Sequence, residues 1–525
     1  MRPGLSLLAV LLCLGKISVA GTEDQLEEES KERYSSSTVG LLKLLKVEED
    51  FADNLVNYGA QLGKKVQSLR TFLSTVSLKL NRNFLERVEY VSNPLNAFSL
   101  LRRTHEDLPK WHSYFKKSLG SEDAAVLDDL VEQVPSKLDL MSAALGIQRI
   151  EKTYDLRIDD LAQGLLQDKQ YEIGLSFRDL VALGRLMFEQ RDYQAAGKWY
   201  RLACKREPDE QDDLINEVLG NPSEHFHRQY IKALFTYGTS LTDPSKSTGE
   251  AFFAAENSVA SATQDNITSI LSSLKENDAE VERELYQKKT PPSIFEIGCR
   301  GQYRPKQKLV CRYKFGTTPF LRLAPLKFEE ISLDPYIAMH HEVLYDSDTR
   351  GFREQSVNMM NGYADHREDG TEIRETVARL SWWTNISKTR ERINQRIKDM
   401  TGLNFSKTEK IQVANYGVGT YFKPHFDYTA EGFETPDAAE LGDRLASIIF
   451  YASDVPQGGA TVFPKINVTV FPRKGSSLFW FNLFDDGRPD IRSQHSVCPV
   501  INGDRWTLTK WIHLFPQMFT RPCAA

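Results

Sequence analysis

The C-terminal part of the chain alternates short β-branched and aromatic runs with glycine-rich turns, and this pattern limits the fold more than any other feature. From about Lys410 the runs are IQVANYGVGTYF, RLASIIFYASDV, GGATVFP, VTVFPRKGSSLFWFNLF, SQHSVCPV and DRWTLTKWIH. Many short strands at such spacing are typical of antiparallel sandwiches and jelly rolls. The pattern therefore predicts a β domain at the C-terminal end.

Two histidines and one aspartate on these strands form a candidate metal site. His425 and Asp427 are two residues apart, so their side chains lie on one face of a strand, and His495 lies on a later strand. Two imidazoles and a carboxylate can occupy one face of an octahedral iron(II) and leave three positions open. Three other histidines have a carboxylate nearby but no downstream strand histidine, and we expect them to be solvated surface residues: His105, His340 and His366.

Arg505 distinguishes this site from a chance pattern. It lies ten residues after His495, across a turn at 502–504, so a hairpin can return its guanidinium to the cavity that His495 enters. The planar, permanently charged guanidinium suits bidentate binding of a carboxylate, as a 2-oxoglutarate oxygenase requires. Lys510 is the alternative anchor, but its odd spacing from Arg505 places it on the opposite strand face unless a bulge intervenes.

These strands resemble the catalytic domain of the collagen-type prolyl 4-hydroxylase α subunit. The similarity spans about Pro292–Cys523 and rests on NYGVGTYFKPHFDYT, DRLASIIFYASDVPQGGATVFP, PRKGSSLFWFNLF and HSVCPV with KWIH. It implies a procollagen-proline 4-dioxygenase that hydroxylates peptidyl proline and decarboxylates 2-oxoglutarate to succinate. It also implies Fe(2+), O₂ and L-ascorbate as the further cofactors.

The resemblance assigns roles to individual positions. It implies that His425, Asp427 and His495 bind iron. Arg505 stands where this family usually has the lysine that binds the distal carboxylate of 2-oxoglutarate, so the affinity for this co-substrate can differ. The resemblance also implies that three residues line the co-substrate and active-site cavity: Tyr416, Thr461 and Trp511. It implies that His513 is a further histidine that assists catalysis there.

The N-terminal half predicts helices. An apolar heptad pattern predicts a coiled coil or a long helical hairpin, with an amphipathic helix inside a bundle as the alternative. Its residues are Leu55, Leu62, Val66, Leu69, Leu73, Val76 and Leu80. The stretch from Leu183 to Pro208 has the spacing of one tetratricopeptide repeat. The resemblance implies that this region binds a proline-rich or collagen-like peptide, with Tyr193 retained and Phe188 in place of a tyrosine.

The expected fold class is α+β with several domains. We expect a signal peptide over 1–20, a helical dimerisation region over 21–145 and a tetratricopeptide-like peptide-binding domain over 146–285. The oxygenase domain is expected over 286–525, as a double-stranded β-helix, or jelly roll, with its core at about 408–518.

The N-terminus indicates the secretory pathway. Arg2, the apolar run Leu5–Leu14 and a small-x-small site ending at Ala20 are typical of a signal peptide. No other apolar run approaches the length of a membrane span, so none is expected. The net charge of −6 argues against a nucleic-acid partner. Four glycosylation sequons fit a lumenal protein: Asn266, Asn385, Asn404 and Asn467.

The resemblance also predicts the cellular compartment and the protein partners. It implies residence in the endoplasmic reticulum lumen, self-association through the N-terminal region, and protein disulfide isomerase as the β subunit of an α₂β₂ tetramer.

Five cysteines remain after the signal peptide is removed. Cys299 and Cys311 are twelve residues apart, and Cys498 and Cys523 are twenty-five apart. In an oxidising lumen these local pairs are the expected disulfides, and they match the two disulfides of the family. Cys204 is then the odd thiol.

Two alternatives to a collagen-directed enzyme remain open. The same chemistry can act on a different proline-rich, noncollagen peptide, because the residues of the peptide groove have changed. A noncatalytic peptide-binding subunit is also compatible with Arg505, although the complete set of metal ligands argues against it.

Overall fold

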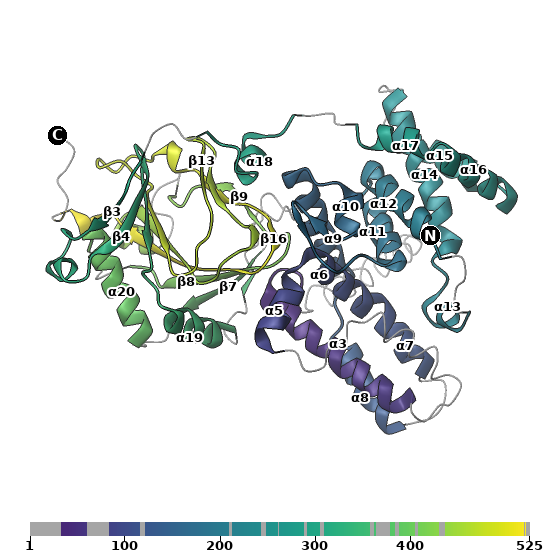
Figure 1. The fold of residues 1–525 in the computed structure, drawn as a ribbon, viewed down its shortest axis with the longest axis horizontal. Coiled ribbons are helices and arrows are strands. Elements are labelled where there is room, and N and C mark those ends of the chain that lie inside the picture. Colours follow the sequence, from purple (N-terminus) through teal and green to yellow (C-terminus); the bar gives the residue numbers. More distant parts are fainter. Residues whose placement is uncertain are drawn as a thin grey trace, which may run out of the picture.

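The computed structural model describes most of the chain after residue 32. The described residues are 33–59, 83–115, 121–208, 213–242, 248–260, 262–287, 291–304, 309–357, 362–363, 378–383, 388–404, 408–429, 436–518 and 520. The predicted signal peptide, the heptad positions after Leu55, Asn385, His366 and Cys523 lie outside them. Figure 1 shows helices from the N-terminal half beside a β domain from the C-terminal half. Within the described ranges, no helix has the length and apolar character needed to cross a membrane.

The first group of helices forms a bundle. Its members are α3 (Thr38–Gly59), α5 (Phe84–Ser92), α6 (Pro94–Arg102), the π-helix η2 (Arg103–Asp107), α7 (Leu108–Phe115), α8 (Ser121–Val131) and α9 (Lys137–Tyr154). Leu55 is buried with Trp111 and Leu127, so the first heptad residue packs against α7 and α8. Ser136 caps α9, which continues to Tyr154. The domain division that we expected after residue 145 therefore falls inside a helix, because the apolar spacing runs across it.

The second group of helices begins after α9. It comprises α10 (Ile158–Ala162), the hairpin strands β1 (Leu165–Leu166) and β2 (Lys169–Gln170), α11 (Phe177–Glu189), α12 (Tyr193–Arg206), α13 (Asp213–Leu219), α14 (Ser223–Thr242), α15 (Thr248–Ala260), α16 (Gln264–Glu276) and α17 (Asp278–Leu285). Ser176 and Asp179 form a capping box that starts α11. A Cβ atom on Gly184 would lie 2.5 Å from the Tyr200 ring, so glycine permits α11 and α12 to pack closely.

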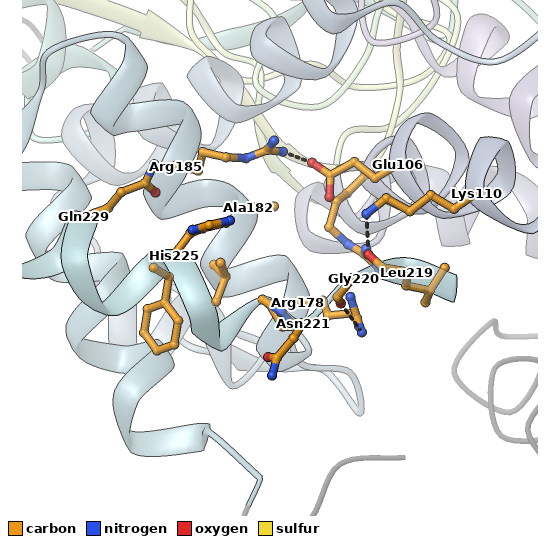
Figure 2. Close-up of a pocket in the computed structure, with 14 residues that line it drawn as sticks. Glu106, Lys110, Arg178, Ala182, Arg185, Leu219, Gly220, Asn221, His225 and Gln229 are labelled. Atoms are coloured by element: carbon orange, nitrogen blue, oxygen red, sulfur yellow. Dashed lines mark hydrogen bonds and ion pairs between the residues drawn. The ribbon is translucent and has the colours of Figure 1, made fainter. Parts of the chain in front are cut away.

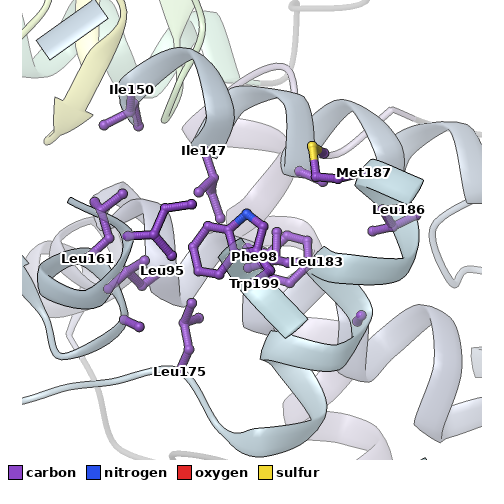
Figure 3. Packing of buried hydrophobic residues seen from close by; sticks show 14 of the residues in the cluster. Leu95, Phe98, Ile147, Ile150, Leu161, Leu175, Leu183, Leu186, Met187 and Trp199 are labelled. Carbon is purple, nitrogen blue, oxygen red and sulfur yellow. The ribbon is translucent and has the colours of Figure 1, made fainter. Parts of the chain in front are cut away.

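One apolar core joins the two groups of helices. Phe98 of α6, Ile147 of α9 and Leu183 of α11 surround Trp199 of α12, which is almost fully buried (Figure 3). Burial of large aromatic and aliphatic side chains supplies the main stabilising free energy of such a core. The helical half is therefore a single packed unit.

The β domain consists of two main antiparallel sheets. The nine-stranded sheet has the order β3-β4-β5-β14-β10-β17-β8-β7-β6, and the four-stranded sheet has the order β13-β12-β15-β9. Side chains of both sheets share one apolar cluster that includes Tyr451, Phe463 and Trp480. The prediction of helices followed by an antiparallel β domain is thus confirmed, and the two sheets have the arrangement of a jelly roll.

The strands of the β domain have the following bounds: β3 (Cys311–Lys314), β4 (Leu326–Leu333), β5 (Tyr336–His341), β6 (Gly362–Tyr363), β7 (Arg379–Trp383), β8 (Ile411–Tyr416), β9 (Phe422–His425), β10 (Arg444–Tyr451), β11 (Gln457–Gly458), β12 (Thr461–Phe463), β13 (Val468–Val470), β14 (Ser477–Phe481), β15 (His495–Val497), β16 (Val500–Asn502) and β17 (Arg505–His513). The helices are α18 (Ile294–Cys299), α19 (Asp346–Val357), α20 (Lys388–Thr401) and α21 (Pro436–Leu441), with 3-10 turns η3 (Pro319–Arg322), η4 (Ile491–Ser493) and η5 (Phe515–Gln517).

The helical half packs against the loop between β8 and β9 and against the connection between β15 and β16. Tyr154 of α9 donates a hydrogen bond of 2.6 Å to the carbonyl of Pro499. A Cβ atom on Gly419 would lie 2.5 Å from Cα of Gly146, so only glycine allows this approach of loop and helix. Because this loop connects Tyr416 to the strand that carries His425, the helices hold one wall of the candidate site.

Candidate active site

Three predicted metal ligands meet at one end of the four-stranded sheet. His425 ends β9 and His495 begins β15, and the two residues are directly paired across these antiparallel strands. Nε2 of His425 lies 3.8 Å from Oδ1 of Asp427, and Nε2 of His495 lies 3.7 Å from Oδ2 of the same carboxylate. The ligand atoms of all three residues lie within 4.8 Å of one another.

Backbone carbonyls fix the orientation of both imidazoles. Nδ1 of His425 donates to the carbonyl of Lys423 at 2.7 Å, and Nδ1 of His495 donates to that of Ser493 at 3.0 Å. Since a carbonyl oxygen only accepts, Nδ1 carries a hydrogen, and Nε2 is the nitrogen left to bind a metal. Two imidazole nitrogens and a carboxylate that face one point fit the ligand set of iron(II).

Two polar side chains hold the carboxylate of Asp427. Ser447 Oγ donates to Asp427 Oδ2 at 2.6 Å, and Asn482 Nδ2 donates to Ser447 Oγ at 2.8 Å. Burial alone would raise the pKa of Asp427, but the two nearby imidazoles and the Ser447 hydroxyl outweigh it, so the pKa is lowered. The carboxyl group is therefore held ionised, as a metal ligand must be.

Arg505 is one of the most deeply buried cations of the described chain. Arg505 is the first residue of β17 and is 1% exposed. Nη2 donates to Oγ1 of Thr461 at 3.1 Å, while Nε has no hydrogen-bond partner among the described residues. A buried guanidinium with an unpaired donor is costly unless an anion satisfies it. The site therefore fits a carboxylate of a bound co-substrate.

Two tyrosines enclose this guanidinium. Its central carbon lies 4.8 Å from the centroid of the Tyr416 ring and 5.6 Å from that of Tyr451. The Tyr451 hydroxyl and Thr461 Oγ1 share a hydrogen bond of 2.9 Å. Burial raises the pKa of both tyrosines, which keeps their hydroxyls neutral. The side chains of Arg505, Thr461 and Tyr416 thus converge.

The end of β17 holds the remaining predicted residues. Trp511 stacks under Arg444, whose guanidinium carbon lies 4.0 Å from the ring centroid. Nδ1 of His513 donates to the carbonyl of Gly442 at 2.6 Å, and its Nε2 lies 3.0 Å from Oε1 of Glu409. Both ring nitrogens of His513 are therefore engaged within the protein.

Lys510, the alternative anchor, points elsewhere. Its ammonium donates to the carbonyl of Glu409, and burial lowers its pKa to about 8. Arg505 and Lys510 thus have separate surroundings, in agreement with alternation of side chains along a strand.

Known proteins match this chain over most of its length. Residues 37–168 match the family model of the prolyl 4-hydroxylase alpha-subunit N-terminal region, and residues 411–513 match that of the 2OG-Fe(II) oxygenase superfamily. Prolyl 4-hydroxylase subunit alpha-2 of Caenorhabditis elegans is 30% identical over 462 residues, which cover 83% of either chain. The chain belongs to the prolyl 4-hydroxylase α-subunit family.

Two further known proteins are similar to this chain. Prolyl 4-hydroxylase subunit alpha-1 of Bos taurus is 28% identical over 518 residues, covering 93% of this chain and 95% of the relative. A crystal structure of the viral collagen prolyl hydroxylase from Paramecium Bursaria Chlorella virus-1, in complex with 2OG, is 19% identical, with a TM-score of 0.28. That match covers 34% of this chain and 94% of the viral chain.

Membership of the oxygenase superfamily agrees with the site. This family member is an iron(II)- and 2-oxoglutarate-dependent dioxygenase, and the predictions of Fe(2+), 2-oxoglutarate and O₂ are confirmed. The His425–Asp427–His495 cluster offers the metal ligands, and the uncompensated guanidinium of Arg505 offers the counter-charge for a carboxylate.

The predicted peptide-binding residues form an aromatic cluster in this family member. Phe188 and Tyr193 make an edge contact with ring centroids 5.3 Å apart, and Tyr193 stacks on Phe252 at 5.8 Å. Phe188 is half-buried, whereas Tyr193 is 7% exposed. Their rings therefore meet at the turn between α11 and α12, with α15 beside them.

The disulfide prediction is wrong. Cys299 is bonded to Cys498, and Cys311 is an exposed free cysteine on the edge strand β3. The reason is spatial: α18 lies against the four-stranded sheet, where Thr469 donates to the carbonyl of Gly298 at 2.9 Å. Cys299 thereby comes within 5.5 Å of Cys498, measured between Cα atoms, although the two are 199 residues apart. The structure does have the predicted free thiol at Cys204.

Two of the three other histidines lie in the described part of the chain, and their surroundings differ. His340 is buried in β5, and burial lowers its pKa to about 3, so the prediction of a solvated surface residue is wrong. His105 is half-buried, and its Nδ1 lies 2.5 Å from the carbonyl of Pro135. His340 belongs to the strand between β4 and β14, whose packing covers it. The sequons at Asn266, Asn404 and Asn467 are exposed.

Sequence reasoning missed the residues that support the predicted ligands. Ser447 and Tyr451 lie four residues apart on β10, so they share one face of that strand, and Asn482 follows β14. Glu409 receives both a bidentate ion pair from Arg444, at 2.6 and 2.8 Å, and the His513 contact. The alternation of the RLASIIFY run could have placed Ser447 and Tyr451 on the inner face, but no signal connects Glu409 to the site.

Proposed function

We propose that the chain hydroxylates C4 of peptidyl proline, as a procollagen-proline 4-dioxygenase that converts 2-oxoglutarate to succinate. The observation that carries this proposal is the buried guanidinium of Arg505, which has a donor without a partner in the same domain as the His-Asp-His cluster. Membership of the prolyl 4-hydroxylase family supports proline as the target.

In this proposal each residue has a defined task. His425, Asp427 and His495 would bind iron(II). Together with 2-oxoglutarate and O₂, the bound iron would supply the oxidising chemistry that hydroxylates the proline ring. Arg505 binds the distal carboxylate of 2-oxoglutarate, and Thr461 and Tyr416 orient that end of the molecule. Trp511 lines the cavity beside Arg444.

The protein contributes position and exclusion of water rather than acid–base chemistry. Ser447 and Asn482 fix the Asp427 carboxylate, and backbone carbonyls fix the two imidazoles. Phe422 covers one imidazole, with its ring centroid 3.5 Å from that of His425. Such preorganisation lowers the barrier because the reacting groups need no rearrangement. His513 acts as a positioning residue through Glu409, which binds the Arg444 that donates to the carbonyl of Asp427.

Peptide binding is assigned to the helices over 146–285. We infer a tetratricopeptide-like unit from the close α11–α12 pair, supported by the Gly184–Tyr200 contact. Phe188 and Tyr193, with Phe252, offer flat apolar faces to a polyproline II ridge. The oxygenase domain then occupies 286–525, with its core at about 408–518, and the dimerisation region occupies 21–145.

The proposal includes the setting of the enzyme. The signal-like segment 1–20, the exposed sequons and the Cys299–Cys498 disulfide support maturation in the endoplasmic reticulum lumen. A coiled coil in the N-terminal region would mediate self-association, protein disulfide isomerase would be the β subunit of an α₂β₂ tetramer, and L-ascorbate would restore oxidised iron. Glycosylation is expected at Asn266, Asn385, Asn404 and Asn467.

A coupled assay tests the function. Purified enzyme, co-expressed with protein disulfide isomerase, is given a Pro-Pro-Gly repeat peptide with iron(II), 2-oxoglutarate and ascorbate, and succinate and 4-hydroxyproline are measured together. Equal yields of both products support the proposal. A second candidate is favoured if the Pro-Pro-Gly peptide yields succinate but no hydroxyproline, while another proline-rich peptide yields both products. That candidate is the same chemistry on a noncollagen peptide, and it rests on Phe188, which offers no hydroxyl to the peptide.

A further inference from the structure

A cavity of about 360 Å³ lies between the first group of helices and the second. One wall comes from η2 and α7, and the facing walls come from α11 and the start of α14 (Figure 2). The polar side chains that matter here are Arg102, Glu106, Lys110, Arg178 and Arg185. None of them belongs to the oxygenase site, which lies in the β domain.

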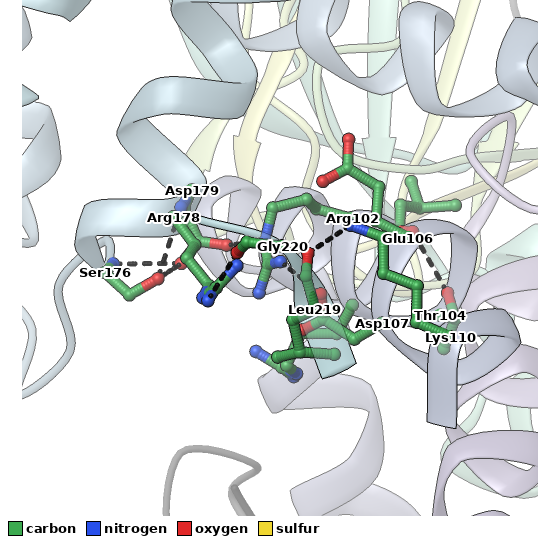
Figure 4. A network of polar contacts seen from close by, with 12 residues as sticks. Arg102, Thr104, Glu106, Asp107, Lys110, Ser176, Arg178, Asp179, Leu219 and Gly220 are labelled. Atoms are coloured by element: carbon green, nitrogen blue, oxygen red, sulfur yellow. Dashed lines mark hydrogen bonds and ion pairs between the residues drawn. The ribbon is translucent and has the colours of Figure 1, made fainter. Parts of the chain in front are cut away.

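Two of the four cations around this cavity have carboxylate partners. Arg102 is almost fully buried and binds Asp179 through Nε at 2.5 Å and Asp107 through Nη1 at 2.9 Å (Figure 4). Arg185 reaches across the cavity to Glu106, with which it forms an ion pair. These pairs join the two groups of helices and neutralise each other's charge.

The other two cations contact only neutral oxygens among the described residues. Lys110 donates to the carbonyl of Leu219, and Nη2 of Arg178 donates to the carbonyl of Gly220 at 3.1 Å and to Oδ1 of Asn216 at 3.2 Å. A Cβ atom on Gly220 would lie 3.8 Å from Nζ of Lys110, so both cations flank one short segment. Burial lowers the pKa of each group by more than the nearby Asp107 carboxylate raises it, and the repulsion of Arg102 adds to the lowering.

The charge balance of the cavity selects a class of ligand. Apart from His225, four cations line the cavity, and the carboxylates of Glu106, Asp107 and Asp179 neutralise three of their charges, which leaves one positive charge uncompensated. A single positive charge with guanidinium and ammonium donors suits one carboxylate, whereas a phosphate would bring nearly two negative charges. The cavity therefore favours a monoanion.

Helix α11 connects this cavity to the aromatic cluster. Val181 and Arg185 line the cavity. Phe188 comes seven residues after Val181 and three residues after Arg185, so it lies on the same side of the helix as Val181. With a rise of about 1.5 Å per residue, Phe188 lies about 5–10 Å along the helix from the cavity wall. An extended polyproline II peptide covers this distance with about two to four residues.

We propose that this cavity binds an acidic side chain of the peptide substrate, two to four residues from the proline that contacts Phe188. Arg178 and Lys110 bind the carboxylate, and the substrate class is a proline-rich peptide with a flanking glutamate or aspartate. The inference rests on the proposed assignment of peptide binding to the helices over 146–285.

Peptide affinity of the full-length enzyme tests the proposal. Each peptide contains five Pro-Pro-Gly repeats and one glutamate, which stands before or after the repeats at one to six residues from the nearest proline. A second series of peptides has glutamine in place of the glutamate. Both ends are capped to remove terminal charges, and dissociation constants are measured by fluorescence anisotropy. We expect glutamate at a spacing of two to four residues to bind about tenfold more tightly than glutamine. High salt should reduce this advantage, because the ligand pairs partly at the surface.

Two variants locate the effect. Arg178→Gln and Lys110→Gln should each remove most of the glutamate advantage and leave the affinity for the glutamine peptides unchanged. Arg178→Lys should retain part of it, which separates lost charge from lost folding. Arg283→Gln is the matched control, because this arginine is 77% exposed and pairs only with Glu280 among the described residues.

The outcomes separate this proposal from the peptide-binding assignment on which it rests. If both series bind equally at every spacing, the carboxylate proposal is overturned while peptide binding stands. If neither series binds, peptide recognition fails and this proposal fails with it. If capped free glutamate binds the wild type but not Arg178→Gln, while both peptide series bind alike, the cavity is a site for small free carboxylates and the proposal is overturned.

Discussion

Arg505 and Tyr416 are directly opposite each other on neighbouring antiparallel strands, and the guanidinium carbon of Arg505 lies 4.8 Å from the centroid of the tyrosine ring. An aromatic face stabilises a cation without neutralising it. Both residues are buried, and no carboxylate of the described chain forms an ion pair with Arg505. The fold thus maintains an isolated positive charge in its interior, which is costly unless a ligand supplies the anion.

Arg505→Ala should raise the KM for 2-oxoglutarate about 30- to 1000-fold, because a buried charge-assisted hydrogen bond contributes roughly 2–4 kcal/mol. The KM for the peptide and the affinity for iron should change little, since the polar and ring contacts of the Arg505 side chain in the described chain are to Thr461, Tyr416 and Tyr451. The measurement is a 2-oxoglutarate titration at saturating peptide and iron.

Arg505→Lys should keep partial activity, because the ammonium retains the attraction and loses the planar fork. Arg488→Gln, an exposed arginine of the same domain, is the control and should behave as the wild type. A KM within about threefold of wild type in Arg505→Ala, under roughly 0.7 kcal/mol, would place the carboxylate anchor elsewhere.

Removal of any one metal ligand should abolish both iron binding and turnover. His425→Ala, Asp427→Ala and His495→Ala each leave two protein ligands where the iron site needs three. Iron content by atomic emission and succinate release should both fall below about a tenth of wild type, which corresponds to roughly 1.4 kcal/mol. His341→Ala is the matched control, because His341 pairs with Glu329 in the nine-stranded sheet, whereas His425 and His495 lie in the four-stranded sheet. Substantial turnover in two of the three ligand variants contradicts the assignment.

Ser447→Ala should weaken iron binding by about 10- to 100-fold, the usual effect of losing a partner of a metal ligand. Ser447 is fully buried and donates to Asp427 at 2.6 Å, so its loss frees the carboxylate to rotate. Ser453→Ala provides the comparison: this serine is buried in the same domain but bonds to the backbone of Asp504 and Trp506. Equal iron affinity in both variants would mean that Asp427 needs no support.

The strand pattern made most of the β domain and the ligand cluster predictable. Period-two alternation places His425 and Asp427 on one face and separates Arg505 from Lys510, and the structure has both features. These inferences depend only on local geometry, which a sequence specifies directly. The close helix pair at Gly184 is likewise local, because a glycine and a ring meet across one short turn.

Features that depend on long-range packing were not predictable. Cys299 meets Cys498 because α18 lies against the second sheet, and no spacing along the chain encodes that contact. His340 is buried because β5 lies between β4 and β14, whereas its own segment reads as helical or loop-like. Glu409 is part of the site because it contacts Arg444 and His513, which lie on strands distant from it in the sequence.

Glu409 should make stability depend on pH in the acidic range. Burial opposes its ionisation, but His513 and Arg444 outweigh burial and hold its pKa at about 2, below the ordinary value of 4.5. A lowered folded-state pKa stabilises the protein above the unfolded-state pKa, and this stabilisation is lost as pH falls from about 5 toward 2. Glu409→Gln should therefore lower the unfolding free energy by up to about 3 kcal/mol at pH 7, and the difference should shrink at pH 4 and below.

Denaturant unfolding at several pH values measures this difference. Asp486→Asn is the control, since Asp486 pairs with Arg488 at an exposed site, where ion pairs contribute little. A wild-type-to-variant difference that stays constant from pH 7 to pH 3 would show that Glu409 acts through packing and not through its charge.

The Cys299–Cys498 disulfide should contribute about 2–5 kcal/mol to the free energy of unfolding, because it restricts a long segment of the unfolded chain. Cys299→Ser, Cys498→Ser and the double variant should lose similar amounts, since each breaks the same bond. Cys311→Ser is the matched control: Cys311 is exposed and free, so its replacement should leave stability unchanged. Peptide mapping without reduction tests the bond directly and should recover a fragment that joins Cys299 of α18 to Cys498, which follows β15. A fragment that joins Cys299 to Cys311, or a destabilised Cys311→Ser, would restore the local pairing that the spacing of the cysteines suggests.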